Sequence, residues 1–251
     1  MTKSRKKRLD ILVAEQGLAP SREAARSLIM SGNILVDDTP VDKPGASISE
    51  DARIVNRKPP MPYVSRGGFK LAHALTELSM DVAGFVCLDV GASTGGFTDC
   101  LLQAGAERVY AVDVGYGQLD WRLRRDSRVT VIERTNIRYA GADILPETFD
   151  LIVVDVSFIS LKIVVPAVEP FLRPAKGVII ALVKPQFEVG RGQVGKGGVV
   201  RDESLHARVL EDLTVFFAEC GLRRQAALSS PILGPRGNRE FLLCLVRNPA
   251  G

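Results

Sequence analysis

The chain has 251 residues, of which 46% are hydrophobic and 25% charged, which suits a globular protein of one large domain or two smaller ones. No run approaches the roughly 18 apolar residues of a membrane span, and no apolar signal core follows the basic N-terminus. The four cysteines are scattered and form neither a zinc motif nor a disulfide framework. We therefore expect a cytoplasmic protein without a membrane span. Residues 1–70 hold 13 Lys and Arg against 8 Asp and Glu, while the remainder holds 20 against 21, which predicts a polyanion-binding module in front of a near-neutral body.

The first 58 residues predict a small α/β unit. Apolar residues at helical spacing within 9–13 indicate a first helix, which Gly17 is placed to end. Ser21 can cap a second helix, on which Arg22 and Arg26 are four residues apart and therefore share a face. Two short strand-like runs, at 34–36 and 52–55, follow with turn residues between them.

A proline-rich spacer is expected next. Three prolines occur in residues 59–62, and they can continue neither a helix nor a central strand. We therefore predict a domain at 1–58, a stiff linker at 59–64 and a second domain at 65–251.

The front unit contains four short motifs: Arg8-Leu9-Asp10, Ser21–Ala25, Ile29 with Gly32, and Ile34–Asp37. Through these motifs it resembles an S4 domain, the small RNA-binding module of ribosomal protein S4 and several RNA-modifying enzymes. The resemblance implies that the arginine-bearing second helix faces the RNA backbone, where the planar guanidinium suits phosphate oxygens. The candidate phosphate contacts are Arg22 and Arg26, with added electrostatic attraction from Arg5, Lys6, Lys7 and Arg8.

The body predicts a Rossmann-like α/β domain, because strands and helices alternate along it. Runs such as 151–155 and 178–183 are continuously apolar, as central parallel strands are. Such a sheet has helices on both faces and binds its ligands at the carboxyl ends of the strands. The predicted strands lie at 86–90, 109–113, 129–132, 151–155, 178–183, 223–229 and 240–246, with a helix around 203–219.

A glycine-rich turn, Gly91–Phe97, follows the first of these strands. Glycines allow close approach of the backbone to a ligand, and Asp113, 22 positions after Gly91, is suited to a ribose hydroxyl. Both features fit a dinucleotide or S-adenosylmethionine (SAM). Asp89 lies beside the turn, where a carboxylate disfavours a pyrophosphate and suits the cationic amino group of the methionine moiety, and the spacing departs from G-x-G-x-x-G. We therefore favour SAM over a nicotinamide cofactor.

A second glycine-rich segment, Gly190–Lys196, satisfies the first part of a P-loop pattern. The next residue is Gly197 rather than Ser or Thr, so the hydroxyl ligand for magnesium is missing. No apolar helix opens directly behind it. We expect residues 189–199 to form a mobile loop near the substrate rather than a triphosphate site.

Charged residues at the ends of buried strands are costly unless paired, so each is a site candidate. Asp155 and Lys184 end two predicted strands, Glu240 begins the last one, and Lys70 opens the first helix of the body.

Five segments with distinctive residues follow one another along the body: Ser65–Leu71, Asp89–Thr98, Asp113–Leu119, Asp155–Ser160 and Val183–Glu188. In their residues and their order the chain resembles the TlyA/hemolysin A family over nearly its entire length. These are ribosomal RNA methyltransferases with an S4 domain and an FtsJ-like catalytic domain, whose sheet is mostly parallel and seven-stranded with the last strand antiparallel.

The resemblance assigns Lys70, Asp155, Lys184 and Glu240 to the Lys-Asp-Lys-Glu tetrad of ribose 2′-O-methyltransferases, and implies methyl transfer from SAM to a cytidine 2′-hydroxyl in 16S and/or 23S rRNA. A lysine acts as base only if its pKa falls, and burial, a second lysine and the cofactor's positive charge all act in that direction. We expect Lys184 to be the base, Lys70 its electrostatic partner, and no metal to be required. The residues assigned by the resemblance to the cofactor are Asp89, Gly91, Ser93, Thr94, Gly95, Phe97, Asp113 and Asn136, and Arg66 joins the RNA contacts.

Three rival interpretations stay open: a Rossmann oxidoreductase, a non-enzymatic RNA-binding assembly factor and a membrane-lytic protein. The lytic interpretation predicts an apolar amphipathic segment, which the sequence does not contain. The chain ends soon after its last strand, without the further helix of longer family members, which favours 23S rRNA as substrate.

Overall fold

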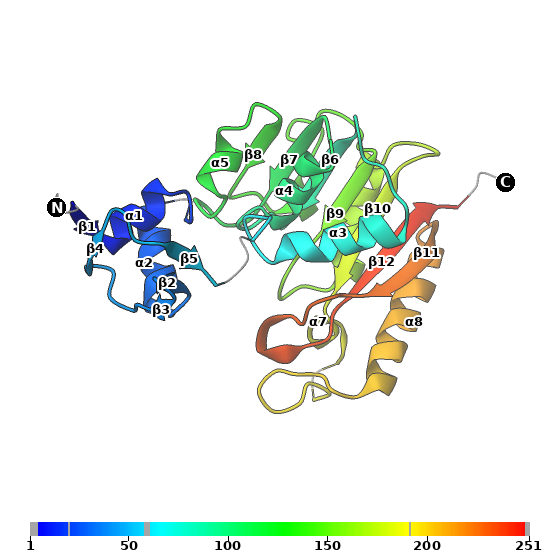
Figure 1. The fold of residues 1–251 in the computed structure, drawn as a ribbon. Helices are drawn as coiled ribbons and strands as arrows, with labels where there is room; N and C mark the ends of the chain where they lie inside the picture. The colour runs from blue at the N-terminus through cyan, green and yellow to red at the C-terminus, as the bar shows by residue number, and fades with distance from the viewer. Residues whose placement is uncertain (1–4, 20, 58–60, 191, 249–251) are drawn as a thin grey trace. The chain divides into compact units, whose positions relative to one another are not determined.

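The computed structural model describes residues 5–19, 21–57, 61–190 and 192–248. The chain forms two compact units, Met1–Pro62 (unit 1) and Tyr63–Gly251 (unit 2), and each is described by itself (Figure 1). Residues 58–60, which include two prolines of the predicted linker, lie outside the described residues.

Unit 1 contains the two helices and the two strands that its sequence predicts. The Ser21 hydroxyl accepts a hydrogen bond from the Ala24 N–H at 3.2 Å, as the expected cap of the second helix. Three further short strands are present that its sequence pattern did not indicate. The elements are β1 (Lys6–Arg8), α1 (Leu9–Glu15), α2 (Arg22–Met30), β2 (Ile34–Val36), β3 (Thr39–Pro40), β4 (Ser47–Ser49) and β5 (Ile54–Asn56).

The core of unit 1 lies between the two helices and the three-stranded sheet of order β3-β2-β5. Leu9 and Val13 of α1, Ala25 and Ile29 of α2, and Ile34 of β2 are all fully buried. The helical spacing of the apolar residues thus identifies the buried faces correctly.

Unit 2 is built on a seven-stranded sheet of order β11-β12-β10-β9-β6-β7-β8. Strand β12 is antiparallel to both neighbours, and the other pairs are parallel, which confirms the predicted fold class. The strands are β6 (Val86–Val90), β7 (Arg108–Val112), β8 (Val129–Ile132), β9 (Leu151–Val154), β10 (Val178–Val183), β11 (Leu222–Ser229) and β12 (Phe241–Arg247).

Helices cover both faces of this sheet (Figure 1). Apolar residues of α3, α4 and α5 pack on one face, and those of α6 and α8 pack on the other. The predicted helix around 203–219 is α8. The helices are α3 (Gly67–Glu77), α4 (Gly96–Gln103), α5 (Trp121–Arg124), α6 (Leu161–Val168), α7 (Pro185–Glu188) and α8 (Glu203–Glu219), with short turns of 3-10 helix at η1 (Ile137–Tyr139), η2 (Glu169–Phe171) and η3 (Pro235–Gly237).

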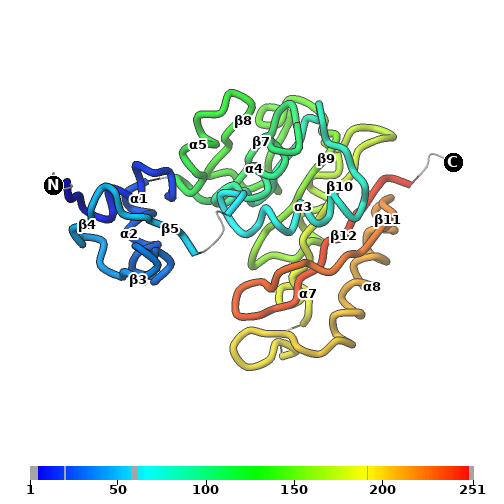
Figure 2. Tube along the Cα trace, in the orientation of Figure 1, coloured from blue at the N-terminus to red at the C-terminus, as the bar shows by residue number. Residues whose placement is uncertain are grey.

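The glycine-rich segment after α7 runs beside the turn that joins β11 to β12 (Figure 2). Asn238, which is 2% exposed, connects them: its amide donates to the Gly198 carbonyl at 3.0 Å and its oxygen accepts from the Val200 N–H at 3.1 Å. After α7 the next helix in the described part of the chain begins only at Glu203, so no helix opens directly behind the glycine-rich segment as it does in a P-loop.

Over the described ranges, no helix combines the length and the apolar character needed to cross a membrane. The same residues include no group of three or more potential metal ligands placed to hold an ion.

Candidate active site

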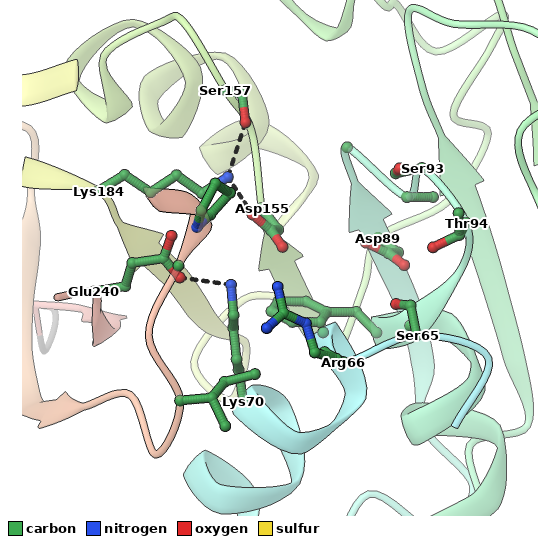
Figure 3. A pocket seen from close by; sticks show the side chains of 18 of the residues that line it. Ser65, Arg66, Lys70, Asp89, Ser93, Thr94, Asp155, Ser157, Lys184 and Glu240 are labelled. Carbon is green, nitrogen blue, oxygen red and sulfur yellow. Dashed lines mark hydrogen bonds and ion pairs between the residues drawn. The ribbon is translucent and has the colours of Figure 1, made fainter. Parts of the chain in front are cut away.

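Charged side chains from five elements of unit 2 meet at the carboxyl ends of the central strands (Figure 3). Strands β10, β9 and β6 are neighbours in the sheet, so Lys184 after β10, Asp155 after β9 and Asp89 within β6 lie at one edge. Lys70 reaches the same place from α3. Glu240 comes directly before β12, because this strand begins one residue later than the predicted strand at 240–246. The antiparallel direction of β12 brings Glu240 to the end of β10.

Two lysine–carboxylate pairs form the centre of the site. Lys184 Nζ lies 2.6 Å from Asp155 Oδ1 and donates a hydrogen bond to Ser157 Oγ at 2.9 Å. Lys70 Nζ donates to Glu240 Oε2 at 2.5 Å, and both lysine side chains are only 10% exposed. All four predicted catalytic residues line one cavity of about 370 Å³. The structure therefore brings together residues that are up to 170 positions apart.

Two glycines make this packing possible. A Cβ atom on Gly91, whose φ is +84°, would lie 2.5 Å from the Asp155 carbonyl oxygen, so only glycine allows the turn to pass the end of β9. A Cβ atom on Gly234 would lie 2.0 Å from Glu240 Oε1. The absence of side chains at these positions leaves space for the Asp155 backbone and the Glu240 carboxylate.

Asp89 faces the same cavity from inside the sheet and is fully buried. Thr98 donates a hydrogen bond to its Oδ2 at 2.6 Å, whereas Oδ1 has no hydrogen-bond partner among the described residues. Burial raises the pKa of Asp89 to about 7, an effect that the Thr98 hydrogen bond partly opposes. A buried carboxylate of this kind is stabilised by an incoming cation.

A second cavity of about 500 Å³ adjoins the first and shares Gly91, Ser93, Asp155 and Ser157 with it. Asp113 lines it, and its carboxylate accepts hydrogen bonds from the Ser93 N–H at 2.8 Å and the Gly115 N–H at 2.7 Å. Asn136 lines it too, with its side-chain oxygen accepting from the Arg138 N–H at 3.2 Å.

These two cavities together fit the chemistry of SAM. The unpartnered oxygen of Asp89 suits the cationic amino group, and Asp113 in the second cavity suits the ribose hydroxyls. Apolar residues such as Val112 and Ile137 line the second cavity and suit a flat base.

Of the other residues assigned to the cofactor, Ser93, Thr94 and Phe97 line the first cavity. Gly95 lines neither cavity; a Cβ atom there would lie 2.2 Å from Leu123 Cδ1, so this glycine packs against α5 and starts α4 with a φ of +95°.

The predicted RNA contacts fall into separate groups. Arg22 and Arg26 line one open hollow on α2, so they share a face as predicted. Lys7 is paired with Glu15 and Glu50, which reduces its free positive charge. Arg5 and Lys6 are exposed, Arg8 contacts Asp10, and Arg66 lines the first cavity of unit 2 beside Lys70 (Figure 3).

Sequence reasoning did not single out Ser157 or Thr98, although each contacts a predicted site residue. Ser157 follows Asp155 by two positions at the same strand end, and this shared position is the signal that could have identified it. Thr98 carries no such signal, because its role depends on the packing of α4 against β6.

Comparisons with known proteins agree with this geometry. Residues 63–247 match the FtsJ-like methyltransferase family, and residues 7–54 match the S4 domain. The chain is 46% identical to the 16S/23S rRNA (cytidine-2′-O)-methyltransferase TlyA of Mycobacterium tuberculosis (strain ATCC 25618 / H37Rv), over 96% of this chain and 90% of that protein. It is 40% identical to Hemolysin A of Brachyspira hyodysenteriae, over 94% of this chain and 98% of that protein. A solved structure described as "Putative hemolysin from Streptococcus thermophilus" superposes with a TM-score of 0.73 at 42% identity, over 98% of this chain and 90% of that one.

Proposed function

The chain belongs to the FtsJ-like methyltransferase family and carries an S4 domain, and from this premise we propose that it methylates the 2′-hydroxyl of a cytidine in ribosomal RNA with SAM as the methyl donor. The observation that carries the proposal is the convergence of Lys184–Asp155 and Lys70–Glu240 on one cavity beside the glycine turn. Two amines and two acids at this place suit deprotonation of a weakly acidic hydroxyl.

The cofactor supplies an electrophilic methyl group on a sulfonium. On the protein side, Asp89 is suited to hold the amino group, the Gly91–Phe97 turn the methionine backbone, and Asp113 and Asn136 the nucleoside. Since the methyl group needs no activation, the remaining barrier lies in alignment and in removal of the hydroxyl proton.

Lys184 is the residue suited to accept that proton. Asp155 and Ser157 fix its Nζ from two sides, which leaves the remaining direction of the amine for the substrate hydroxyl. The base must be the neutral amine; it accepts the proton as the hydroxyl oxygen forms its bond to the methyl carbon and the sulfur–methyl bond breaks. The product proton then leaves from the ammonium of Lys184.

Lys70 and Glu240 complete the opposite wall. Their pair places a second positive charge where oxyanion character develops on the ribose oxygen, and Glu240 holds the Lys70 amine in one position. Arg66 at the cavity rim supplies a cation for the neighbouring phosphate. Recognition of rRNA by the arginine-bearing face of unit 1 is the other half of the proposal.

The test incubates the full chain with tritiated SAM and purified 30S or 50S subunits. We expect label in rRNA, protected from alkaline hydrolysis at one cytidine in 23S, 16S or both. The matched variant Lys184→Ala should bind SAM but leave no label. Label in protein, label in DNA, or no label would overturn the proposal.

Each rival interpretation predicts a different result in an assay of its own. An oxidoreductase would show a thermal shift with a nicotinamide dinucleotide and none with SAM. An assembly factor without catalysis would support ribosome maturation equally well as Lys184→Ala. A lytic protein, the activity suggested by the name of one relative, would release haemoglobin from erythrocytes independently of SAM.

A further inference from the structure

Asp10 is the one charged residue buried in the described part of unit 1, and none of the roles above accounts for it. It lies in the first turn of α1 and is fully inaccessible, with its backbone N–H bonded to the Pro44 carbonyl at 3.0 Å. A carboxylate in such a place requires positively charged partners.

Two arginines from different elements supply that charge. Arg8, at the end of β1, donates from Nε to Oδ1 and from Nη2 to Oδ2, both at 3.0 Å. Arg22, at the start of α2, donates from Nε to Oδ2, also at 3.0 Å. One buried carboxylate therefore fixes two guanidinium planes, which would otherwise repel each other.

The outward sides of both arginines stay available. The side chains of Arg8 and Arg22 are 49% and 56% exposed, and within the described ranges the terminal nitrogens of Arg22 donate no hydrogen bond to the protein. Arg22 also lines the open hollow on α2 together with Arg26. The Asp10 carboxylate binds the inner N–H groups of the two guanidinium groups. Among the described residues, the outer N–H groups stay free and are held in a fixed direction.

Stability alone gives a weak reason for this arrangement. Buried ion pairs often contribute no more than apolar residues of the same volume, and unit 1 already has an apolar core around Leu9, Val13 and Ile29. Long arginine side chains lose rotamer freedom on binding a phosphate, and a site that has ordered them beforehand loses less. Planar forks held in place match phosphate oxygens well.

We propose that Asp10 is a positioning residue for RNA: it holds Arg8 and Arg22 as a preordered pair of guanidinium groups for the phosphate backbone. The proposal rests on the proposed function, since it concerns how unit 1 binds the same rRNA. It goes further because Asp10 repels RNA by its own charge and is nevertheless given a favourable role in RNA binding.

The proposal predicts a direction of change in RNA affinity that simple electrostatics does not. Asp10→Asn removes one negative charge next to a basic surface, so electrostatics alone predicts tighter RNA binding. Positioning predicts weaker binding despite the added net positive charge. The matched control is Glu23→Gln, which makes the same charge change at an exposed residue beside Arg22.

The experiment measures the dissociation constant of the full chain for its ribosomal subunit at physiological salt, together with KM and kcat for methylation. We expect about a 10-fold weaker complex and a raised KM for Asp10→Asn with unchanged kcat and SAM affinity, since one charge-assisted contact is worth roughly this factor. Glu23→Gln should bind as tightly as wild type or up to about 3-fold more tightly. Equal or tighter binding by Asp10→Asn would overturn the positioning role.

A second variant distinguishes the loss of positioning from the unfolding of unit 1. Arg22→Lys keeps the charge and leaves Asp10 with a partner, but it lacks the planar fork. We expect it to lose most of the affinity that Arg22→Ala loses, with an unchanged melting curve; affinity equal to wild type would contradict the proposal. If wild-type protein binds no rRNA at all, the proposed function fails first, and this inference fails with it.

Discussion

Each unit buries one aspartate completely, and the two have opposite surroundings. Asp10 in unit 1 contacts two arginines, whose hydrogen bonds lower its pKa to about 2. Asp89 in unit 2 has hydrogen bonds from Thr98 but no positively charged partner among the described residues, and burial raises its pKa to about 7. Because both side chains are equally buried, the difference between their pKa values comes from the presence or absence of positively charged neighbours. A buried acid with its cations built in orders those cations for a partner, whereas one without them marks the place where a cationic ligand binds.

The same contrast extends to the kind of cation. The carboxylate of unit 1 has arginines, which keep their charge at any relevant pH, while Asp155 and Glu240 of unit 2 have lysines, which can lose a proton. Permanent charge suits phosphate binding, and a removable proton suits base catalysis.

Exchanging the type of cation in unit 2 should give the largest effect. Lys184→Arg keeps a cation beside Asp155 but cannot accept a proton, so we expect kcat for methyl transfer to fall about 1,000-fold, as for loss of a general base. Binding of SAM and of the ribosomal subunit should change less than about 3-fold. Single-turnover transfer of labelled methyl measures the effect, and retention of a tenth of wild-type activity would contradict the role of Lys184 as base.

Removing the unpaired carboxylate comes next. Asp89→Asn should weaken SAM binding about 30- to 100-fold at pH 7.5, because a hydrogen-bonded charge pair is replaced by a neutral amide. Isothermal titration calorimetry measures this, with the exposed Asp143→Asn as a matched control of unchanged affinity. Wild-type affinity in Asp89→Asn would mean that the amino group of the ligand lies elsewhere.

The same variant should be more stable than wild type without ligand. A carboxyl with a raised pKa contributes stability that is complete below its unfolded value of 3.8 and is lost as the pH rises through about 7. The advantage of Asp89→Asn in the free energy of unfolding should therefore grow between pH 4 and 7 and reach a few kcal/mol at most. Thermal melts at pH 5 and pH 8 check the sign; a variant less stable than wild type at pH 8 would refute it.

A smaller effect concerns SAM affinity in the wild type. Since ionised Asp89 is the form that binds a cation, affinity should increase about 5- to 10-fold from pH 6 to pH 7.5, as expected for a group that titrates near pH 7. In Asp89→Asn the same interval should leave the dissociation constant flat. A slope that persists in the variant would assign the titration to another group.

Much of the fold and part of the candidate site could be predicted from the sequence. The alternation of apolar runs and turns predicts the sheet of unit 2, and the resemblance to the TlyA/hemolysin A family is confirmed by the relatives and by both family matches. Polar residues at strand ends identify Asp155 and Lys184, because parallel strands bring their carboxyl ends to one edge.

The contacts that distinguish the two aspartates could not be predicted in this way. Asp10 appears in the sequence only as part of a motif, and its pairing with Arg22 depends on how α1 packs against α2. The lack of a partner for Asp89 Oδ1 is likewise a property of packing, since neighbouring residues in the sequence do not reveal which polar groups face a cavity.

The smallest effect is expected in unit 1, where the RNA affinity should barely depend on pH. With its pKa near 2, Asp10 is ionised throughout the neutral range, so RNA affinity of the SAM-free chain should change less than about 2-fold between pH 6 and pH 7.5. The stability that Asp10 contributes is present above about pH 4 and is lost as the pH falls toward 2. In this interval the unfolded carboxyl, with its ordinary pKa of 3.8, takes up a proton, whereas the folded carboxyl stays ionised beside its arginines until the pH nears 2. Filter binding across the neutral interval, and amide exchange at Leu9 and Val13 between pH 4 and pH 2.5, separate the two ranges. If the RNA affinity changed with pH in the same way as the SAM affinity, both ligands would depend on one titrating group in unit 2. The assignment of RNA binding to Asp10 and of SAM binding to Asp89 would then be wrong.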